Sequence, residues 1–333
     1  MSNEPRVCDI GEFGLLGRIR EILGYHSQEI LIGIGDDAAV IQPRTQPVVL
    51  STDAMVEGIH FRKSWTSASD LAYKAMASNL SDLAAKCAEP AYSLITLGLP
   101  GATPISWVEE FYNALVGMKD EWGIEVVGGD TVRSETLVVS ITVWGYQTTS
   151  SPVSQRTARP GDRILVTGTL GDAAAGLELL EGGVVPAVQD SDRHFLIYRF
   201  LKPTPRVREA MAIARTALPT AMTDISDGAA RDVPKLCEAS RVGAVLYGDR
   251  FPCSAALREF AAGRAAAYAW KGGEDYELLF TLPPDKADFL LSGWNIPECP
   301  LTVIGEIVEK SRGVKIEHWD GEPETGFDHF RDH

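Results

Sequence analysis

Short apolar runs alternate with helical patterns along most of the chain. The runs Tyr92–Leu99 and Arg163–Thr167 predict buried strands, because apolar and β-branched residues follow one another there without a polar face. Ile105–Trp122 repeats apolar residues at helical spacing and predicts an amphipathic helix. Two further strands are predicted over Ile124–Val127 and Leu137–Trp144. The chain is therefore expected to mix helices and strands throughout.

A polar stretch, Thr148–Pro160, interrupts this pattern near the middle of the chain. The chain has 333 residues, whereas a single hydrophobic core usually stops growing near about 250 to 300 residues. We therefore expect two domains, residues 1–150 and 151–333, with the boundary in the polar stretch.

The stretch Val48–Phe61 combines an apolar run with oxygen-rich side chains. Val48–Leu50 predicts a buried strand, and Ser51-Thr52-Asp53 follow as its polar end. Seven residues after Asp53, and beyond a glycine that permits close backbone approach, stands His60. A strand end of this kind is expected to present side chains to a binding site.

Four other acidic clusters lie beside Gly, Ser or Thr residues at predicted element ends. Each has a simpler reading: a turn for Asp36-Asp37, a solvated helix face for Asp82, a hairpin for Asp130, and a helix N-cap for Asp227. Asp36-Asp37 stand inside an apolar segment, where unpaired carboxylates would be costly to bury. We expect the clusters to converge with Asp53 on one site. They are Asp36-Asp37, Asp82 in the predicted helix Ser69–Ala88, Asp130 in the predicted turn Gly128–Thr131, and the pair Asp224 and Asp227.

Composition narrows the class of protein. The formal net charge of −15 argues against a nucleic-acid-binding surface, which needs a basic face. Five widely spaced cysteines without a CxxC pair predict reduced thiols rather than a disulfide frame. The chain shows no long apolar segment, and we expect a cytoplasmic protein without a membrane span.

Carboxylates with almost no Cys or His favour hard cations, magnesium before zinc. Magnesium in enzymes is commonly shared with substrate phosphates, so the residues alone predict a magnesium-dependent enzyme that handles a polyphosphate. Gly168, Gly171 and Gly176 follow a predicted strand but fit neither GxGxxG nor GxxxxGK[ST]. A Rossmann or P-loop nucleotide site is therefore disfavoured.

Seven motifs carry a family resemblance: GIGDDAAV, STDAMVEGIHF, NLSDLAAKCAEP, GGDT, DISDG, GGEDYELLF and GFDHF. In this order and spacing they closely resemble the bacterial thiamine-monophosphate kinases, a family of the aminoimidazole ribonucleotide synthetase and selenophosphate synthetase superfamily. The resemblance runs from about Gly11 to Phe330. It implies ATP-dependent phosphorylation of thiamine monophosphate to thiamine diphosphate by direct in-line transfer.

The resemblance also implies a fold and partners. The fold would be α/β (α+β), with an N-terminal sheet domain that binds ATP and magnesium and pairs in a homodimer, followed by a C-terminal α/β domain. The cofactors would be several Mg2+ ions, with ATP as co-substrate. No nucleic acid or membrane partner is implied.

Site residues carried over from the family fall into four groups. The catalytic residues would be Asp53, Asp130, Arg156 and Asp224. The magnesium ligands would be Asp37, Ser51, Thr52, Asp53, Asp82, Asp130, Asp224 and Asp227. ATP would meet Gly129, Asp130, Arg156 and Ser226, and thiamine monophosphate would meet His60, Glu274 and Phe327.

Two positions depart from the family pattern. Cys87 stands where a glycine is usual, and Ala229 replaces a customary leucine after DISDG. If position 87 is left-handed, the cysteine costs about 1 kcal/mol. Selenophosphate synthetase is disfavoured because Cys8 lies outside any Gly-rich reactive loop. A non-catalytic sensor of magnesium and nucleotide, or another ATP-using member of the superfamily, remains the alternative.

Overall fold

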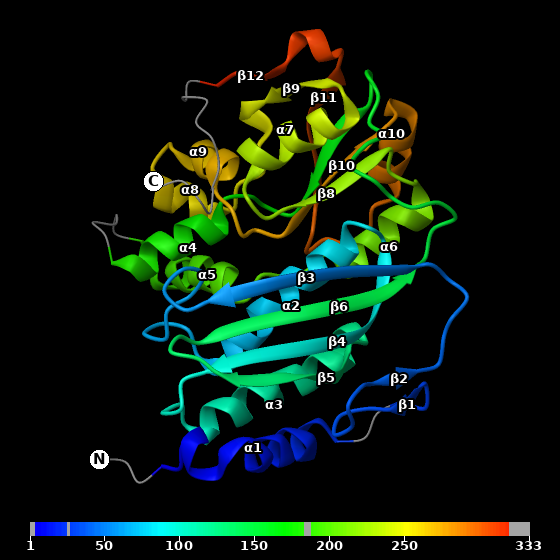
Figure 1. Ribbon diagram of the computed structural model, residues 1–333. Helices are drawn as coiled ribbons and strands as arrows, with labels where there is room; N and C mark the ends of the chain where they lie inside the picture. Colours follow the sequence, from blue (N-terminus) through cyan, green and yellow to red (C-terminus); the bar gives the residue numbers. More distant parts are fainter. Residues whose placement is uncertain (1–3, 25–26, 183–187, 320–333) are drawn as a thin grey trace. The chain divides into compact units, whose positions relative to one another are not determined.

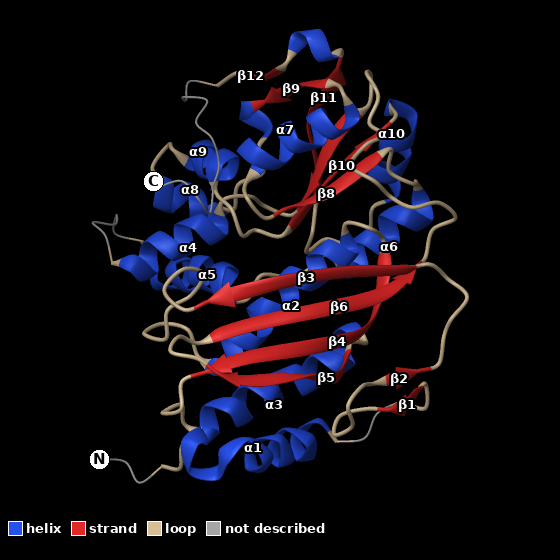
Figure 2. Ribbon diagram, viewed as in Figure 1, coloured by secondary structure: helices blue, strands red, loops and turns tan. Residues whose placement is uncertain are grey.

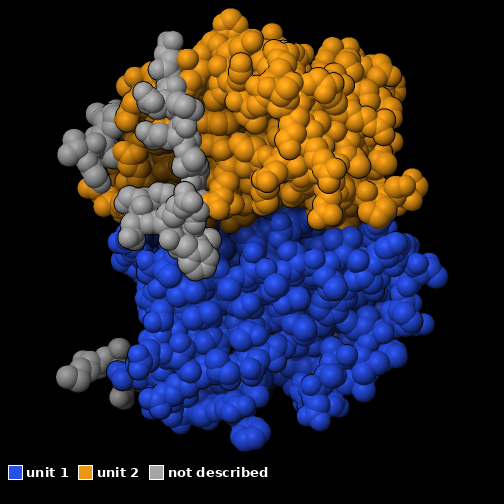
Figure 3. Space-filling model, turned by 45° about the horizontal axis from the view of Figure 1, so that its top comes forward, with its two compact units in different colours: residues 1–83, 89–147 blue, residues 84–88, 148–333 orange. Residues whose placement is uncertain are grey.

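A computed structural model describes residues 4–24, 27–182 and 188–319. The chain folds into two compact units, coloured in Figure 3. Unit 1 comprises residues 1–83 and 89–147, and unit 2 comprises residues 84–88 and 148–333. Among the described residues, no helix is both long enough and apolar enough to cross a membrane.

Unit 1 is a four-stranded sheet with helices on one face (Figure 1). The strand order is β3-β6-β4-β5, in which β3 and β6 are antiparallel and β4 and β5 are parallel. A separate antiparallel pair is formed by β1 and β2. The elements are α1 (Val7–Leu23), β1 (Ile30–Ile32), β2 (Val40–Ile41), β3 (Val48–Val56), α2 (Ala68–Ala84), β4 (Ala88–Leu99), α3 (Ile105–Trp122), β5 (Glu125–Arg133) and β6 (Val138–Gln147).

The two faces of this sheet differ in burial. Alternate side chains of β6, including Ile141 and Val143, are fully buried on the face that α2 and α3 cover (Figure 2). On the opposite face, Leu50 of β3 is 67% exposed and Leu94 of β4 is 39% exposed. The helix-covered face is called the inner face below, and the other is called the outer face.

The prediction of a short buried strand at Val48–Leu50 was wrong in two respects. β3 continues to Val56, because it pairs with β6 from Val48–Tyr146 to Val56–Val138. Ser51, Thr52 and Asp53 therefore lie within the strand and not at its end. The apolar residues that precede them are not buried, because β3 is an edge strand with one face open.

The predicted turn at Gly128–Thr131 was also wrong. These residues belong to β5, which pairs in parallel with β4 from Tyr92–Glu125 to Leu99–Arg133. A bulge at this point shifts the register between Ser93 and Leu94. The neighbours of β5 and β6 in the sheet exclude the alternative reading of a β5–β6 hairpin, since β4 and not β6 lies beside β5.

Unit 2 is a six-stranded sheet in the order β12-β9-β11-β7-β10-β8. Its neighbouring strands are antiparallel except for β12 and β9, which are parallel. The elements are β7 (Arg163–Thr167), α4 (Asp172–Glu181), α5 (Asp190–Leu201), α6 (Val207–Thr216), β8 (Ala221–Ile225), α7 (Ala229–Ser240), β9 (Gly243–Tyr247), the 3-10 helix η1 (Gly248–Arg250), α8 (Ala255–Ala261), α9 (Ala265–Lys271), β10 (Glu277–Leu282), α10 (Pro284–Gly293), β11 (Leu301–Val308), the 3-10 helix η2 (Lys310–Arg312) and β12 (Val314–Glu317).

The central strands of unit 2 are buried on both faces. Ile164 and Val166 of β7 join a core with Val233 of α7, whereas Leu165, between them, joins a second core with Ile213 of α6 and residues of α10. Successive side chains of a strand point to opposite faces, so two apolar layers require a strand that is apolar at every position. This explains the continuous apolar run Ile164–Val166 of β7.

Cys87 adopts the left-handed conformation that a family glycine would favour, with a φ of 52°. Its side chain is fully buried, and its Sγ lies 4.0 Å from Sδ of Met222. Cys87→Gly and Cys87→Ala both remove the thiol, but only alanine keeps a β-carbon in this conformation. We expect the glycine variant to be about 1 kcal/mol more stable than the alanine variant. Urea unfolding of both variants measures the difference, and a more stable alanine variant would contradict the strain.

Candidate functional site

Two oxygen-bearing side chains, Ser51 of β3 and Asp82 of α2, meet in unit 1. Ser51 and Asp53 occupy the inner face of β3, opposite the buried Val143 and Ile141 of β6. The Ser51 hydroxyl donates a 2.5 Å hydrogen bond to Oδ2 of Asp82 on α2. Asp82 is half-buried and faces the sheet, so its alternative reading as a solvated outer residue was wrong.

The backbone of Asp53 is anchored to the same helix. Its N–H donates to Oδ1 of Asn79 at 3.1 Å, and the Asn79 amide in turn donates to the carbonyl of Ala75 at 2.9 Å. Asn79 is buried and one helical turn before Asp82. Asn79 belongs to the NLSDLAAKCAEP motif. Its hydrogen bond to β3 explains why a polar residue occupies this buried position of α2.

Thr52 points to the other face of the sheet. Its hydroxyl donates to the carbonyl of Ile141 at 3.1 Å and lies 3.0 Å from the hydroxyl of Thr142. The alternation of a strand therefore separates the Thr52 hydroxyl from the Ser51, Asp53 and Asp82 side chains. A ligand on the inner face can meet Thr52 only through its main chain.

Asp130 and Gly129 lie on adjacent positions of β5, the edge strand beside β4. Asp130 is exposed, it pairs with Thr96 on the outer face, and its Oδ1 accepts the N–H of Thr131 at 2.8 Å. A β-carbon added at Gly129 would lie 1.9 Å from the carbonyl oxygen of Ile95. Only glycine allows the two strands to approach this closely.

Asp36 and Asp37 lie in the connection between β1 and β2. Both are exposed, and Oδ1 of Asp36 accepts the N–H of Asp37 at 2.8 Å. The expectation of acids inside a buried apolar segment was wrong, because β1 and β2 are short and largely exposed strands. Because both carboxylates are exposed, no cation is needed to offset a cost of burying them.

His60 has a defined hydrogen-bonding role in the turn after β3. The main-chain N–H of Val56 donates to its Nδ1 at 3.1 Å. Because an acceptor nitrogen carries no proton, the neutral ring holds its proton on Nε2.

A second acidic group lies in unit 2, where β8 runs into α7. Asp224 on β8 is only 6% exposed, and Ser226 and Asp227 form the connection to the helix. Gly228 is the N-cap of α7, so the reading of Asp227 as the N-cap was wrong. A β-carbon at Gly228 would lie 2.6 Å from the carbonyl oxygen of Lys271, which explains the glycine.

Asp232, in the first turn of α7, holds this connection in place. Its Oδ2 accepts the N–H of Ser226 at 3.2 Å and that of Asp227 at 3.1 Å. Burial, together with the nearby carboxylates Asp224 and Asp227, raises the pKa of Asp232 to about 7. This residue was not predicted from the sequence, although an acid in the first turn of a helix was a usable signal.

Arg156 lies in the segment that precedes β7 and is exposed. The same segment runs beside β8, since the N–H of Met222 donates to the carbonyl of Ser154 at 3.0 Å and Gln155 donates to Thr223 at 2.8 Å. These contacts attach the Arg156 segment to the strand that carries Asp224. Arg156 therefore lies in a segment that is hydrogen-bonded along β8, while its own side chain is exposed.

Glu274 belongs to a loop that lies against the Ser226 connection. Its N–H donates to the carbonyl of Ser226 at 2.8 Å, and the N–H of Tyr276 donates to the carbonyl of Ile225 at 2.9 Å. Asp275, between them, accepts the N–H groups of Gly171 and Ala173. Burial raises the pKa of Asp275 to about 7, although Arg199 and these N–H groups favour its charged form.

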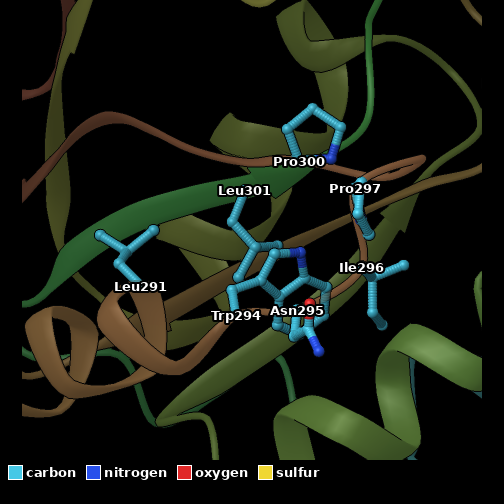
Figure 4. Close-up of a pocket in the computed structure, with 7 residues that line it drawn as sticks. All are labelled: Leu291, Trp294, Asn295, Ile296, Pro297, Pro300 and Leu301. Atoms are coloured by element: carbon cyan, nitrogen blue, oxygen red, sulfur yellow. The ribbon is translucent and has the colours of Figure 1, made fainter.

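The start of α4 is therefore not a phosphate loop. Helix N-termini attract anions, but here the carboxylate of Asp275 already occupies the N–H groups at the helix start. A cavity of about 280 Å³ lies elsewhere in unit 2, between α10 and β11. Figure 4 shows that Trp294, Leu301 and other apolar residues line it with Asn295 and without a titratable side chain. It offers no groups for phosphate chemistry.

Among the described residues, no three Asp, Glu, His or Cys side chains lie close enough together to bind a metal ion. The oxygen ligands instead occur as smaller groups, such as Ser51 with Asp82. Phe327 lies outside the described residues.

Comparisons with known proteins cover nearly the whole chain. Two family models match, the AIR synthase related protein N-terminal domain over residues 35–147 and the corresponding C-terminal domain over residues 159–317. A thiamine-monophosphate kinase of Salmonella typhimurium is 38% identical over 326 residues, which cover 96% of this chain and 98% of the relative. The chain belongs to the thiamine-monophosphate kinase family.

Solved structures of the family agree with this assignment. The thiamine-monophosphate kinase of Stenotrophomonas maltophilia K279a is 38% identical, with a TM-score of 0.82 over 94% of this chain and 98% of that one. A structure of AaThiL complexed with AMPPCP and TMP is 34% identical, with a TM-score of 0.76 over 99% of this chain and 100% of that one. The α/β fold expected from the family resemblance is confirmed.

Proposed function

We propose that this protein transfers the terminal phosphate of ATP to thiamine monophosphate and so forms thiamine diphosphate. The observation that carries the proposal is the similarity, over nearly the full length, to thiamine-monophosphate kinases, including a structure complexed with AMPPCP and TMP. AMPPCP resembles ATP but has a carbon bridge in place of an oxygen, so its terminal phosphate is not transferred. A nucleotide and a phosphate acceptor bound together are the substrates of a phosphotransferase.

The acceptor requires little activation by the protein. A phosphate monoester has a second pKa near about 6, so its attacking oxygen is already largely ionised at neutral pH. No general base is needed, and the main barrier is the repulsion between two anions. We infer direct in-line transfer from ATP to the acceptor oxygen. Acid-stable or hydroxylamine-sensitive labelled phosphate on the protein would contradict direct transfer.

Charge compensation is assigned to magnesium and to Arg156. When bound, Mg2+ would offset the negative charge of the phosphates. Magnesium is commonly held by one or two carboxylates together with substrate phosphates, and the oxygen-only groups of both units suit this kind of binding. The proposed ligands are Asp37, Ser51, Thr52 through its carbonyl, Asp53, Asp82, Asp130, Asp224 and Asp227.

The substrate contacts are assigned from the family motifs. ATP is assigned to Gly129, Asp130, Arg156 and Ser226. Thiamine monophosphate is assigned to His60, Glu274 and Phe327. The Nε2–H of His60 suits a phosphate oxygen, because a neutral donor recognises the anion without taking up a proton. Glu274 suits the cationic or amino groups of thiamine.

We further propose a homodimer formed through the outer face of the unit 1 sheet. Leu50, Leu94 and Val132 are 67%, 39% and 46% exposed there, on three strands of one sheet. Contiguous exposed apolar residues commonly mark protein interfaces. Sedimentation of the intact protein is expected to give the mass of two chains, and a monomer at micromolar concentration would contradict the dimer. The five free cysteines suit a reducing compartment, so we place the protein in the cytoplasm.

The proposed reaction is tested by incubating the protein with ATP, thiamine monophosphate and Mg2+ and measuring thiamine diphosphate by chromatography. We expect product that depends on all three components. Thiamine without its phosphate should be a poor acceptor, because its hydroxyl would first have to lose a proton. Tight nucleotide binding without product would contradict the kinase and favour a nucleotide sensor.

A further inference from the structure

The helix start that resembles a phosphate site is filled by the chain's own carboxylate. Asp275 is 1% exposed. Its Oδ2 accepts the N–H of Gly171, the N-cap of α4, at 2.5 Å, and its Oδ1 accepts the N–H of Ala173 at 3.1 Å. An anion at this position is favoured by the helix dipole as well as by the two hydrogen bonds. Asp275 is thereby fixed at both carboxylate oxygens.

The residues on either side of Asp275 are attached to a different element. Glu274 and Tyr276 donate their N–H groups to the carbonyls of Ser226 and Ile225, at 2.8 and 2.9 Å. The loop therefore lies between α4 and the β8–α7 connection. Within this loop, Asp275 contacts the α4 N-terminus through both of its carboxylate oxygens.

The backbone on both sides of Asp275 is strained. Glu274 has a φ of 66° and Tyr276 a φ of 53°, both in the left-handed region that favours glycine. Such a conformation persists in residues with a β-carbon only where the surrounding contacts enforce it. The contacts of Asp275 lie between the two strained positions and, together with the main-chain hydrogen bonds of Glu274 and Tyr276, supply that constraint.

We propose that Asp275 is a positioning residue, which holds Glu274 in the conformation that meets the thiamine moiety of the substrate. The inference rests on the proposed function, because the assignment of Glu274 to thiamine monophosphate is part of that proposal. Asp275 does not touch the substrate in this scheme. Its effect on the reaction passes through the backbone of Glu274.

A double-mutant cycle tests this dependence. We expect Asp275→Asn to raise the KM for thiamine monophosphate about tenfold. The asparagine side chain has no negative charge, and its NH2 group would face one of the main-chain N–H donors of Gly171 and Ala173, to which it cannot hydrogen-bond. Glu274→Ala should also raise this KM. If Asp275 acts through Glu274, then Asp275→Asn should change the KM less than about twofold in the Glu274→Ala background. Asp285→Asn, an exposed acid on α10, is the matched control and should leave the KM unchanged.

The outcomes separate this inference from the proposed function. Absence of thiamine diphosphate with the unmodified protein would overturn the function itself. With an active protein, additive effects of the two substitutions would overturn the positioning role, because Asp275 would then act independently of Glu274. An unchanged KM in either single variant would overturn it as well. If Asp275→Asn does not fold, Asp275→Ser takes its place in the cycle, since its hydroxyl can still accept one N–H.

Discussion

Asp53→Asn is expected to lower kcat/KM for thiamine monophosphate about 10³-fold in the presence of Mg2+. Asp53 shares the inner face of β3 with Ser51, whose hydroxyl binds Asp82. The amide keeps the shape of the side chain but removes a negative charge and a strong cation ligand. Turnover measured over a magnesium titration should show a loss that excess Mg2+ restores only in part.

The fold of this variant should remain intact. The Asp53 main chain is held by Asn79 through its N–H, independently of the side chain. Thermal unfolding of Asp53→Asn should therefore match that of the unmodified protein. Asp120→Asn removes an exposed carboxylate from α3 and serves as the control for charge alone. Equal activity of the Asp53 and Asp120 variants would exclude Asp53 from the magnesium site.

The elements best predicted from the sequence are those with a complete local signal. The predicted strand Arg163–Thr167 is β7, and the predicted helix Ile105–Trp122 is α3. Both are set by their own pattern, since β7 is apolar through its centre and α3 repeats its apolar residues at helical spacing. At these positions, tertiary contacts do not alter the secondary structure that the local pattern favours.

β5 shows where local signals fail. Gly128-Gly129 favoured a turn by propensity, yet the two glycines lie in a strand whose partner, β4, comes earlier in the chain and is separated from it by the whole of α3. Gly129 is required because a β-carbon there would lie 1.9 Å from the Ile95 carbonyl oxygen, which belongs to a distant segment of the chain. No pattern within β5 reports that contact.

The sequence predicts which residues are candidates for the site better than it predicts where their side chains lie. Family motifs and residue chemistry selected Ser51, Asp53 and Asp82, and the structure places them on one face of unit 1. The positions of Asp232 and Asp275 as acceptors for main-chain N–H groups depend on how α7 and α4 start. Such supporting residues follow from tertiary packing and carry no motif of their own.

Glu277→Gln is expected to reduce the free energy of unfolding of unit 2 by about 3–5 kcal/mol. Glu277, on β10, is fully buried and binds Arg206 at 2.6 and 2.7 Å and Arg199 at 2.8 Å. Thr167 donates a further bond at 2.6 Å. Despite burial, the two guanidinium groups hold the pKa of Glu277 below its usual range. Glutamine would remove the carboxylate that binds both buried cations, and would leave Arg206 with Glu209 at 3.5 Å and Arg199 with Asp172 at 3.8 Å as the remaining ion pairs.

The size of this effect depends on the burial of the ion pairs. An exposed glutamate of unit 2 that also binds an arginine allows the contribution of burial to be measured. Glu298 binds Arg208 at 2.8 Å, but these side chains are 58% and 70% exposed. Water screens an exposed pair, so Glu298→Gln should cost less than about 1 kcal/mol. Denaturant unfolding followed by circular dichroism compares the two variants. Similar losses for Glu277→Gln and Glu298→Gln would show that the buried network contributes no more than a surface ion pair, and that β7, α5, α6 and β10 are held together by apolar packing alone.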